Sequence, residues 1–362
     1  AMAVRRYFMR TENPQLAIIF TDCSKSAKEQ TNICMYPGCN EKAINSHIMQ
    51  KNGILSSIAE DQHLWESAVD HFKAEYIGFQ RKGINKIYTF LGFCNTHDTE
   101  IFKKIESQDD IDFSDYESCL LFALRTACNE YRIKEIVIKQ QECTLVHPDT
   151  VSNGMLEISI EQSKIGLKDL SFQIDSMWND LQNKTESFVF EFREMELFEL
   201  CLNSIYTYDT SQEIQDYILK HGKDMERTSE IFISLFPYRE KSILLMGYHK
   251  ADLAKVKSFV NLFFKENEKR LKRRLSSLIT FNCETWVCSN TLFKEKFEGL
   301  DSEFFKTMLF SGENGNERKT FNVNLFSNNF KKEFKDFVDK NIAKPWPVKL
   351  SKNPFLSQHS NY

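Results

Sequence analysis

The sequence CMYPGC at residues 34–39 and the sequence GFCNTHD at residues 92–98 decide the fold expected for the N-terminal part of this chain. They supply four metal-binding side chains in two closely spaced pairs, Cys34 with Cys39 and Cys94 with His97. Proteins build tetrahedral zinc sites from thiolates and imidazole nitrogens, and short pairs are a common way to supply them. The spacing therefore predicts a zinc ion held by these four residues.

The residues around the ligands indicate how each pair is presented. Pro37 and Gly38 favour a tight turn, because proline presets one backbone dihedral and glycine accepts a positive φ. Cys94 and His97 are three residues apart at the start of a predicted helix, and side chains at that spacing lie on one face. A turn, a hairpin and a helix start in this order are the layout of a treble-clef zinc module. Four protein ligands complete a tetrahedron, so we expect this zinc to be structural.

The sequence SHI at residues 46–48 lies between the two ligand pairs. Together with the cysteine pair and with Cys94-x-x-His97-Asp98, it resembles the HNH, or His-Me finger, nuclease family over residues 33–106. The resemblance implies that His47 is a general base toward an attacking water and that Asp98 binds a catalytic divalent ion. A carboxylate ligand suits Mg²⁺ or Mn²⁺.

The sequence departs from the family pattern in several places. Ser46 stands where the family commonly has an acidic residue, and Asn45 and Asn95 are both candidates for its middle asparagine. The interval from His47 to Cys94 is longer than the compact motif requires. His47 has an alternative role as an orienting or core histidine in a zinc module without catalysis.

The charge of the chain limits how it can contact nucleic acid. A formal net charge of −4 over 362 residues excludes a generally basic surface, so a nucleic-acid site would have to be local. Residues 265–274 are the candidate for such a site. The alternative is a solvated helix face, in which Glu266 and Glu268 balance the cations. The cations of this segment are Lys265, Lys269, Arg270, Lys272, Arg273 and Arg274.

No apolar run is long enough to cross a membrane, and the first residues lack the layout of a secretion signal. We therefore expect a cytoplasmic protein without membrane contact and with reduced cysteines. The sequence CETWVC at residues 283–288 is expected to be a strand and its end. Buried, unpaired thiols are expected at Cys23, Cys119, Cys128, Cys143 and Cys201.

The ligand spacing and the hydrophobic periodicity together predict an α+β protein with an N-terminal treble-clef zinc module with helices and a C-terminal antiparallel sheet covered by helices. The expected division is a zinc module at 1–110, a helical region at 111–185, an α+β domain with the antiparallel sheet at 186–315 and a C-terminal tail at 316–362. The expected helices lie at 116–139, 158–182, 253–278 and 330–339. Strands are expected at 16–20, 84–90, 188–195, 197–202, 231–236, 242–248 and 281–287.

The leading functional hypothesis is a metal-dependent HNH-like endonuclease acting on DNA or RNA, with the C-terminal domain sensing a partner or trigger. By analogy, such a combination would suit a bacterial anti-phage defence effector. The alternative is a non-catalytic, zinc-stabilised scaffold that binds a protein partner or a second copy of itself. An enzyme needs His47 exposed beside Asp98, whereas a scaffold buries it against a backbone partner.

Overall fold

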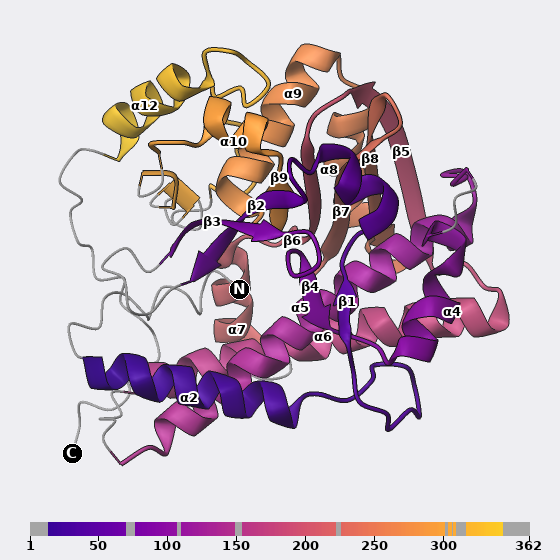
Figure 1. The fold of residues 1–362 in the computed structure, drawn as a ribbon, viewed down its shortest axis with the longest axis vertical. Coiled ribbons are helices and arrows are strands. Elements are labelled where there is room, and N and C mark those ends of the chain that lie inside the picture. The colour runs from indigo at the N-terminus through magenta and orange to yellow at the C-terminus, as the bar shows by residue number, and fades with distance from the viewer. Residues whose placement is uncertain are drawn as a thin grey trace.

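The computed structural model describes residues 14–69, 77–106, 110–148, 154–221, 226–300, 303–305, 307–308 and 316–342. Within them a seven-stranded sheet lies between two layers of helices (Figure 1). The strand order is β3-β2-β9-β6-β7-β8-β5, and every neighbouring pair is antiparallel. The strands are β2 (His63–Val69), β3 (Ile77–Gly83), β5 (Phe188–Glu196), β6 (Leu200–Thr207), β7 (Glu230–Tyr238), β8 (Lys241–His249) and β9 (Trp286–Cys288).

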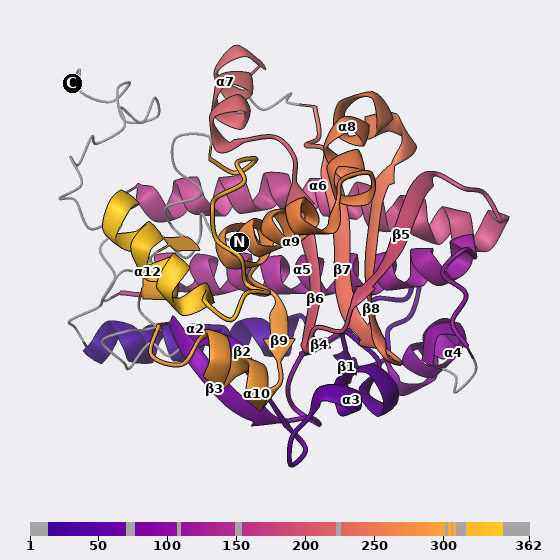
Figure 2. The ribbon, with the colours of Figure 1, turned by 90° about the horizontal axis from the view of Figure 1, so that it is seen from above.

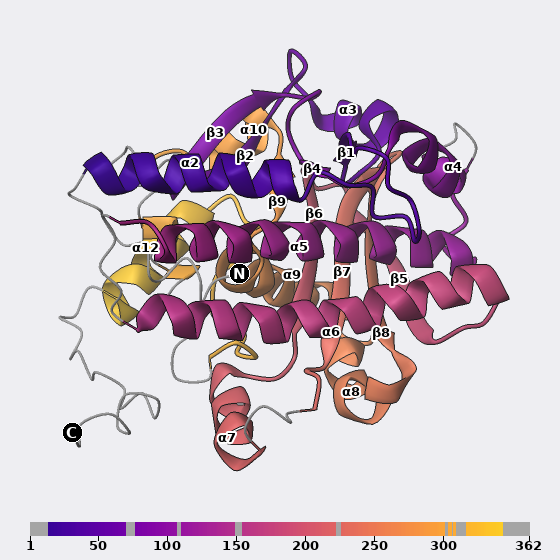
Figure 3. The same ribbon diagram turned by 90° about the horizontal axis from the view of Figure 1, so that it is seen from below.

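Helices α2 (Pro14–Gln30), α5 (Tyr116–Leu145) and α6 (Met155–Asn183) form one layer, and they run side by side in Figure 3. The opposite layer, seen in Figure 2, holds α8 (Leu253–Phe264), α9 (Glu268–Ser277), α10 (Asn290–Lys296) and α12 (Phe330–Asn341). Other elements are η2 (Lys51–Leu55), α3 (Ser56–Ile58), α7 (Ser211–His221), η4 (Lys250–Asp252) and η5 (Leu278–Asn282). This combination of helices with an antiparallel sheet agrees with the predicted α+β class.

Helices cover the central strands of the sheet on both faces, and the burial of the strand side chains shows this. Almost every side chain of β7 and β8 is buried, because helices pack on both faces of the sheet. In contrast, β5 mixes buried and exposed positions along its length, as expected at the edge of a sheet. A large hydrophobic core lies between the sheet and α5, and a second lies between the sheet and α8, α9 and α10. A small third cluster joins Phe281, Val323 and Phe337.

The prediction of a strand at 16–20 is wrong, because these residues belong to α2. Ala17, Phe20, Cys23 and Ala27 are buried at helical spacing, whereas Ile18 is 46% exposed. A run of five apolar residues fits a strand or one side of a helix equally well. The spacing that continues to Ala27 identifies the helix.

The single helix predicted at 253–278 is two helices. α8 ends at Phe264, and the side chain of Asn267 caps α9 by accepting a hydrogen bond from the Arg270 amide. The strand predicted at 281–287 is also corrected, since η5 runs to Asn282 and β9 covers only Trp286–Cys288. At 84–90, strand β4 is confined to Thr89–Leu91.

The boundary predicted at residue 110 cuts through the large sheet. β2 and β3 come from the predicted zinc module, yet β2 pairs with β9, and β9 pairs with β6. Within the predicted tail at 316–362, α12 confirms the helix expected at 330–339. Residues 343–362 lie outside the described residues. No described helix combines the length and apolar character needed to span a bilayer.

A disulfide joins Cys23 of α2 to Cys143 of α5, with their Cα atoms 5.6 Å apart. The expectation of unpaired thiols is therefore wrong for these two residues. It is confirmed for the other three, Cys119, Cys128 and Cys201, which are free and buried. The paired cysteines are 120 residues apart in sequence, so only the packing of α2 along α5 brings them together.

Reduction of the Cys23–Cys143 disulfide is expected to lower the free energy of unfolding by about 2–5 kcal/mol, because it releases a long loop in the unfolded chain. The measurement is denaturant unfolding of the wild type with and without reductant. A variant with both Cys23→Ala and Cys143→Ala should resemble the reduced protein and not respond to reductant. Detection of ten free thiols after the unreduced protein is unfolded in denaturant with a metal chelator would contradict the pairing.

Candidate metal centre

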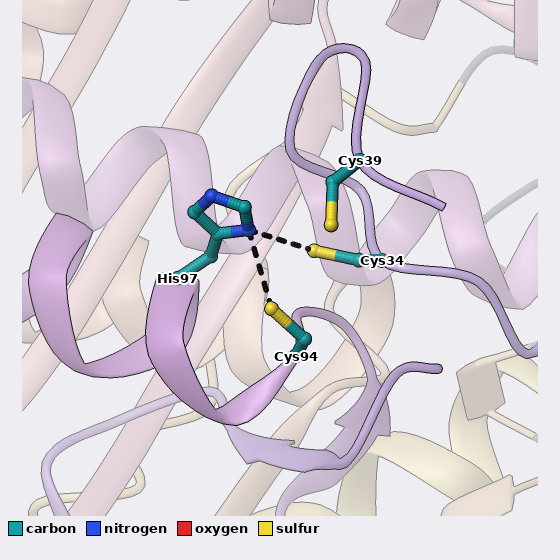
Figure 4. A group of neighbouring side chains, drawn as sticks. All are labelled: Cys34, Cys39, Cys94 and His97. Atoms are coloured by element: carbon teal, nitrogen blue, oxygen red, sulfur yellow. Dashed lines mark hydrogen bonds between the residues drawn. The ribbon is translucent and has the colours of Figure 1, made fainter. Parts of the chain in front are cut away.

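The four predicted ligands come together at one point. The sulfur atoms of Cys34, Cys39 and Cys94 and a ring nitrogen of His97 all lie within 4.8 Å of one another. His97 Nδ1 is 3.5 Å from Cys34 Sγ and 3.2 Å from Cys94 Sγ (Figure 4). A tetrahedral zinc ion with bonds of about 2.0–2.3 Å needs ligand atoms roughly 3.5–3.8 Å apart. The group can therefore hold a metal ion such as zinc.

The first two ligands sit on a tight turn whose backbone follows from the sequence. Gly38 has φ +79°, a conformation that glycine adopts without strain, and the amide of Cys39 donates to the carbonyl of Tyr36 over 3.0 Å. Outside the turn, the amide of Cys34 donates to the carbonyl of Glu41 at 2.8 Å. The turn expected from the Pro-Gly pair is confirmed.

The other two ligands lie at the start of α4 (Asn95–Glu106). Cys94 precedes the helix, and its carbonyl accepts the hydrogen bond of the Asp98 amide at 2.9 Å. A hydrogen bond from the backbone of His97 lowers the pKa of the Cys94 thiol. Burial, in contrast, raises the pKa of Cys34 to about 11. Metal binding at this centre therefore requires the Cys34 thiol to release a proton that it otherwise holds at neutral pH.

The ring of His97 is oriented by aromatic packing. Tyr36 stacks on it with ring centroids 3.9 Å apart and an interplanar angle of 14°. Trp178 of α6 meets the other ring of this stack, Tyr36, edge-on at 5.5 Å. This contact has no signal in the sequence, because Trp178 is distant from the ligands along the chain and nothing in its neighbourhood marks it.

Arg132 of α5 holds the two halves of the centre together. Its guanidinium donates to the carbonyl of Ile33 at 2.6 Å, to that of Leu91 at 2.7 Å and to that of Thr31. Ile33 directly precedes Cys34, and Leu91 ends β4, just before Cys94. Arg132 is only 5% exposed and Thr31 only 2%, so the hydrogen bond between them is closed off from water, whereas Ile33 is half exposed. Sequence reasoning missed this role, because one arginine on a helix has no distinguishing signal.

His47 ends β1 (Asn45–His47), which pairs with β4, and its ring is half-buried. Its Nε2 lies 2.9 Å from the carbonyl oxygen of Ile84. A carbonyl only accepts hydrogen bonds, so Nε2 carries the proton and Nδ1 keeps its lone pair when the ring is neutral. Burial lowers the pKa of His47 below its ordinary value, which favours this neutral form.

Asp98 lies in the first turn of α4, close to Ser46 and His47. Burial raises the pKa of Asp98, and the positive charge of Arg125 opposes this shift. One carboxylate oxygen, Oδ1, is buried and accepts no hydrogen bond. Ser46 is 1% exposed and accepts a hydrogen bond from the Phe93 amide at 3.2 Å. An acidic residue at position 46 would thus be buried.

Arg125 is a buried cation close to these groups. It is 1% exposed, forms an ion pair with Glu106 at 2.7 Å and lies over the ring of Phe102 at 3.9 Å. Its charge acts on both His47 and Asp98.

In the part of the chain that the structure describes, the three cysteines and His97 are the one group of three or more potential metal ligands. His47 and Asp98 therefore form a polar pair and not a second such group.

The basic segment at 265–274 lies on the other face of the sheet. α9 packs in the core opposite to the one that contains the metal centre (Figure 2). Lys272 is engaged with Glu196 at 2.6 Å, and Arg274 with Glu266 at 2.9 Å. Internal ion pairs thus already hold two of its six cations, and contact with nucleic acid remains a prediction.

Comparison of this chain with models of known protein families, with curated proteins and with solved structures finds no match in any of the three.

We expect the purified protein to contain about one zinc ion per chain, and Cys39→Ser to lose it, because a serine hydroxyl is a poor zinc ligand. The melting temperature should fall by on the order of 5–10 °C, since metal binding contributes to folding. Cys119→Ser is the control, because that thiol is buried and only donates to the Phe113 carbonyl. Equal zinc content in both variants, by elemental analysis, would contradict the assignment.

Arg132→Met should lower the free energy of unfolding by about 3–5 kcal/mol, because it leaves Glu135 without its ion pair and three carbonyls without their donor. Arg239→Met provides the comparison, since that arginine is 62% exposed and pairs with Asp110 at the surface. It should cost at most about 1 kcal/mol. Denaturant unfolding with zinc present measures both, and similar losses would show that Arg132 has no special role.

Proposed function

We propose that this protein is a metal-dependent, HNH-like endonuclease that hydrolyses phosphodiester bonds in DNA or RNA. The observation that carries the proposal is the hydrogen bond between His47 Nε2 and the Ile84 carbonyl, which leaves Nδ1 free to take a proton. A structural zinc at the cysteines and His97 would complete a treble-clef module that presents His47 on a strand and Asp98 on the following helix.

In this proposal His47 removes the proton of the attacking water through Nδ1. Asp98 Oδ1, which accepts no hydrogen bond, is the atom suited to hold a Mg²⁺ or Mn²⁺ ion. Such an ion, when bound, would stabilise negative charge on the phosphate and the leaving oxygen. Its remaining ligands would be water and the substrate, as is common for Mg²⁺, so three protein ligands are not required. The neutral state of His47 suits it to act as a base near pH 7.

One observation favours the alternative, a zinc-stabilised scaffold without catalysis. The half-buried ring of His47 and its backbone partner are what a histidine that only braces the hairpin would show. The same contact serves both functions, because holding Nε2 orients the ring whether or not Nδ1 reacts. Activity therefore has to distinguish them.

His47→Ala should abolish cleavage of plasmid, linear and single-stranded substrates with Mg²⁺ or Mn²⁺, with a loss of about 10²-fold or more, because it removes the proposed base. Zinc content should stay unchanged. The matched control is His249→Ala, since His249 is another half-buried histidine, at the end of β8. Asp98→Ala should have the same effect as His47→Ala, whereas Glu100→Ala, on the exposed side of the same helix turn, should remain active. Zinc-loaded wild type without activity would favour the scaffold.

The rate of cleavage should depend little on pH between about 8 and 6.5 and decline only at lower pH. A general base works in its neutral form, and the lowered pKa of His47 keeps it neutral below its ordinary value of 6.5. A pH–rate profile, together with an NMR titration of the His47 ring, measures this. A midpoint above pH 6.5 that follows the ring titration would contradict the inferred environment.

A further inference from the structure

The outer edge of β5 has no partner strand among the residues that the structure describes. β5 pairs with β8 along its whole length, from Phe188 opposite His249 to Glu196 opposite Lys241. β5 is the last strand in the order, and no other described strand pairs with it. No described helix or strand runs along its outer side in Figures 1 and 2. Edge strands of this length are templates for pairing with another chain.

The hydrogen bonds at the start of β5 show which residues point outward. The amide of Lys250 donates to the Ser187 carbonyl at 2.8 Å, so position 187 belongs to the ladder with β8. The Phe188 amide instead donates to the hydroxyl of Tyr116 at 3.1 Å. In an antiparallel pair the residues alternate between facing the neighbouring strand and facing away from it. The backbone groups of residues 190, 192 and 194 are therefore directed outward.

The side chains of β5 are complementary to those of a second, antiparallel β5. With a two-fold axis at Phe192, Glu191 lies opposite Arg193 of the second copy, and Arg193 lies opposite its Glu191. Residues 191 and 193 share one face of the sheet, so both pairs bring opposite charges together. Phe192, which is 42% exposed, lies opposite its own copy and forms an aromatic pair there.

The position of Arg193 suits this pairing. Its Nη1 donates to the carbonyls of Phe263 and Glu266, each at 3.3 Å, which holds the guanidinium on the α8 side of the strand. Both carbonyls belong to the C-terminal end of α8 and the residues just after it, where a cation is favoured. The side chain is thus held on the face of the sheet where Glu191 of the second copy would lie.

The other edge of the sheet lacks this complementarity. β3 carries two adjacent cations, Arg81 and Lys82, and no acidic residue. A second copy paired there would find no opposite charge for either cation. The choice between the two edges therefore follows from their charges.

We propose that two copies of this chain associate through antiparallel pairing of their β5 strands, with the two-fold axis at Phe192, so that the two sheets form one continuous sheet. Residues 190 and 194 of each copy then exchange main-chain hydrogen bonds with residues 194 and 190 of the other. The two Phe192 residues exchange theirs with each other. This association does not depend on whether the protein is a nuclease.

Sedimentation velocity over a concentration series tests the proposal, with Glu194→Pro as the main variant. Proline removes an outward-facing N–H and leaves the ladder with β8 intact. Glu194→Ala is the matched control, since it removes the same exposed side chain and keeps the N–H. We expect the wild type and Glu194→Ala to be dimers, and Glu194→Pro to be a monomer with an unchanged circular-dichroism spectrum.

A charge exchange provides the second test and does not rely on proline. Glu191→Arg alone and Arg193→Glu alone each set like charges opposite one another twice per dimer, and each should weaken dimerisation about tenfold. The double variant with both changes restores opposite charges and should recover most of the affinity. It also lacks the contacts of Arg193 with α8, so recovery cannot come from those contacts.

A wild type that is monomeric at its highest soluble concentration would overturn the proposal, and the open edge would then serve a different partner. A dimer that persists unchanged in Glu194→Pro and in both single charge variants would also overturn it, because the interface would lie elsewhere.

Discussion

One guanidinium group, that of Arg132, connects the parts of this protein on which the candidate metal centre depends. It donates hydrogen bonds to the carbonyls of Thr31, Ile33 and Leu91, which belong to the segments that carry the two ligand pairs. Because the guanidinium and Thr31 are buried, losing this group would leave at least the Thr31 carbonyl as a buried acceptor without its donor. The long helix α5 thus fixes the distance between two segments that are almost 60 residues apart in sequence.

The same helix also sets the electrostatics beside the centre. Arg125 brings a buried positive charge next to Asp98 and His47, and its own ion pair with Glu106 ties the end of α4 to α5. A cation there opposes the effect of burial on Asp98 and disfavours the protonated form of His47. Both influences suit a neutral base beside an ionised carboxylate, which is the arrangement that the proposed hydrolysis needs.

The large sheet joins the N-terminal and C-terminal regions of the chain. β2, from the N-terminal part, and β9, from the C-terminal part, are neighbours, and α10 packs beside them through the stacked rings of Trp65 and Phe293 at 3.7 Å. Helices α5 and α6 contact the candidate metal centre through Arg132 and Trp178. The two edge strands of the large sheet differ in charge, and the proposed self-association rests on that difference.

The local sequence was enough to predict the cysteine–histidine group that can hold a metal ion, the turn at Pro37–Gly38 and the long helices at 116–139 and 158–182. These features depend on neighbours a few residues away, and local spacing reports them directly. Only the tertiary structure decided the Cys23–Cys143 pairing, the role of Arg132 and the helical state of residues 16–20. Each depends on contacts between distant segments, and a short apolar run or a single side chain is compatible with several partners. The charge pattern of β5 was visible in the sequence, but its position at an open edge was not, because strand order is set by packing of the whole sheet.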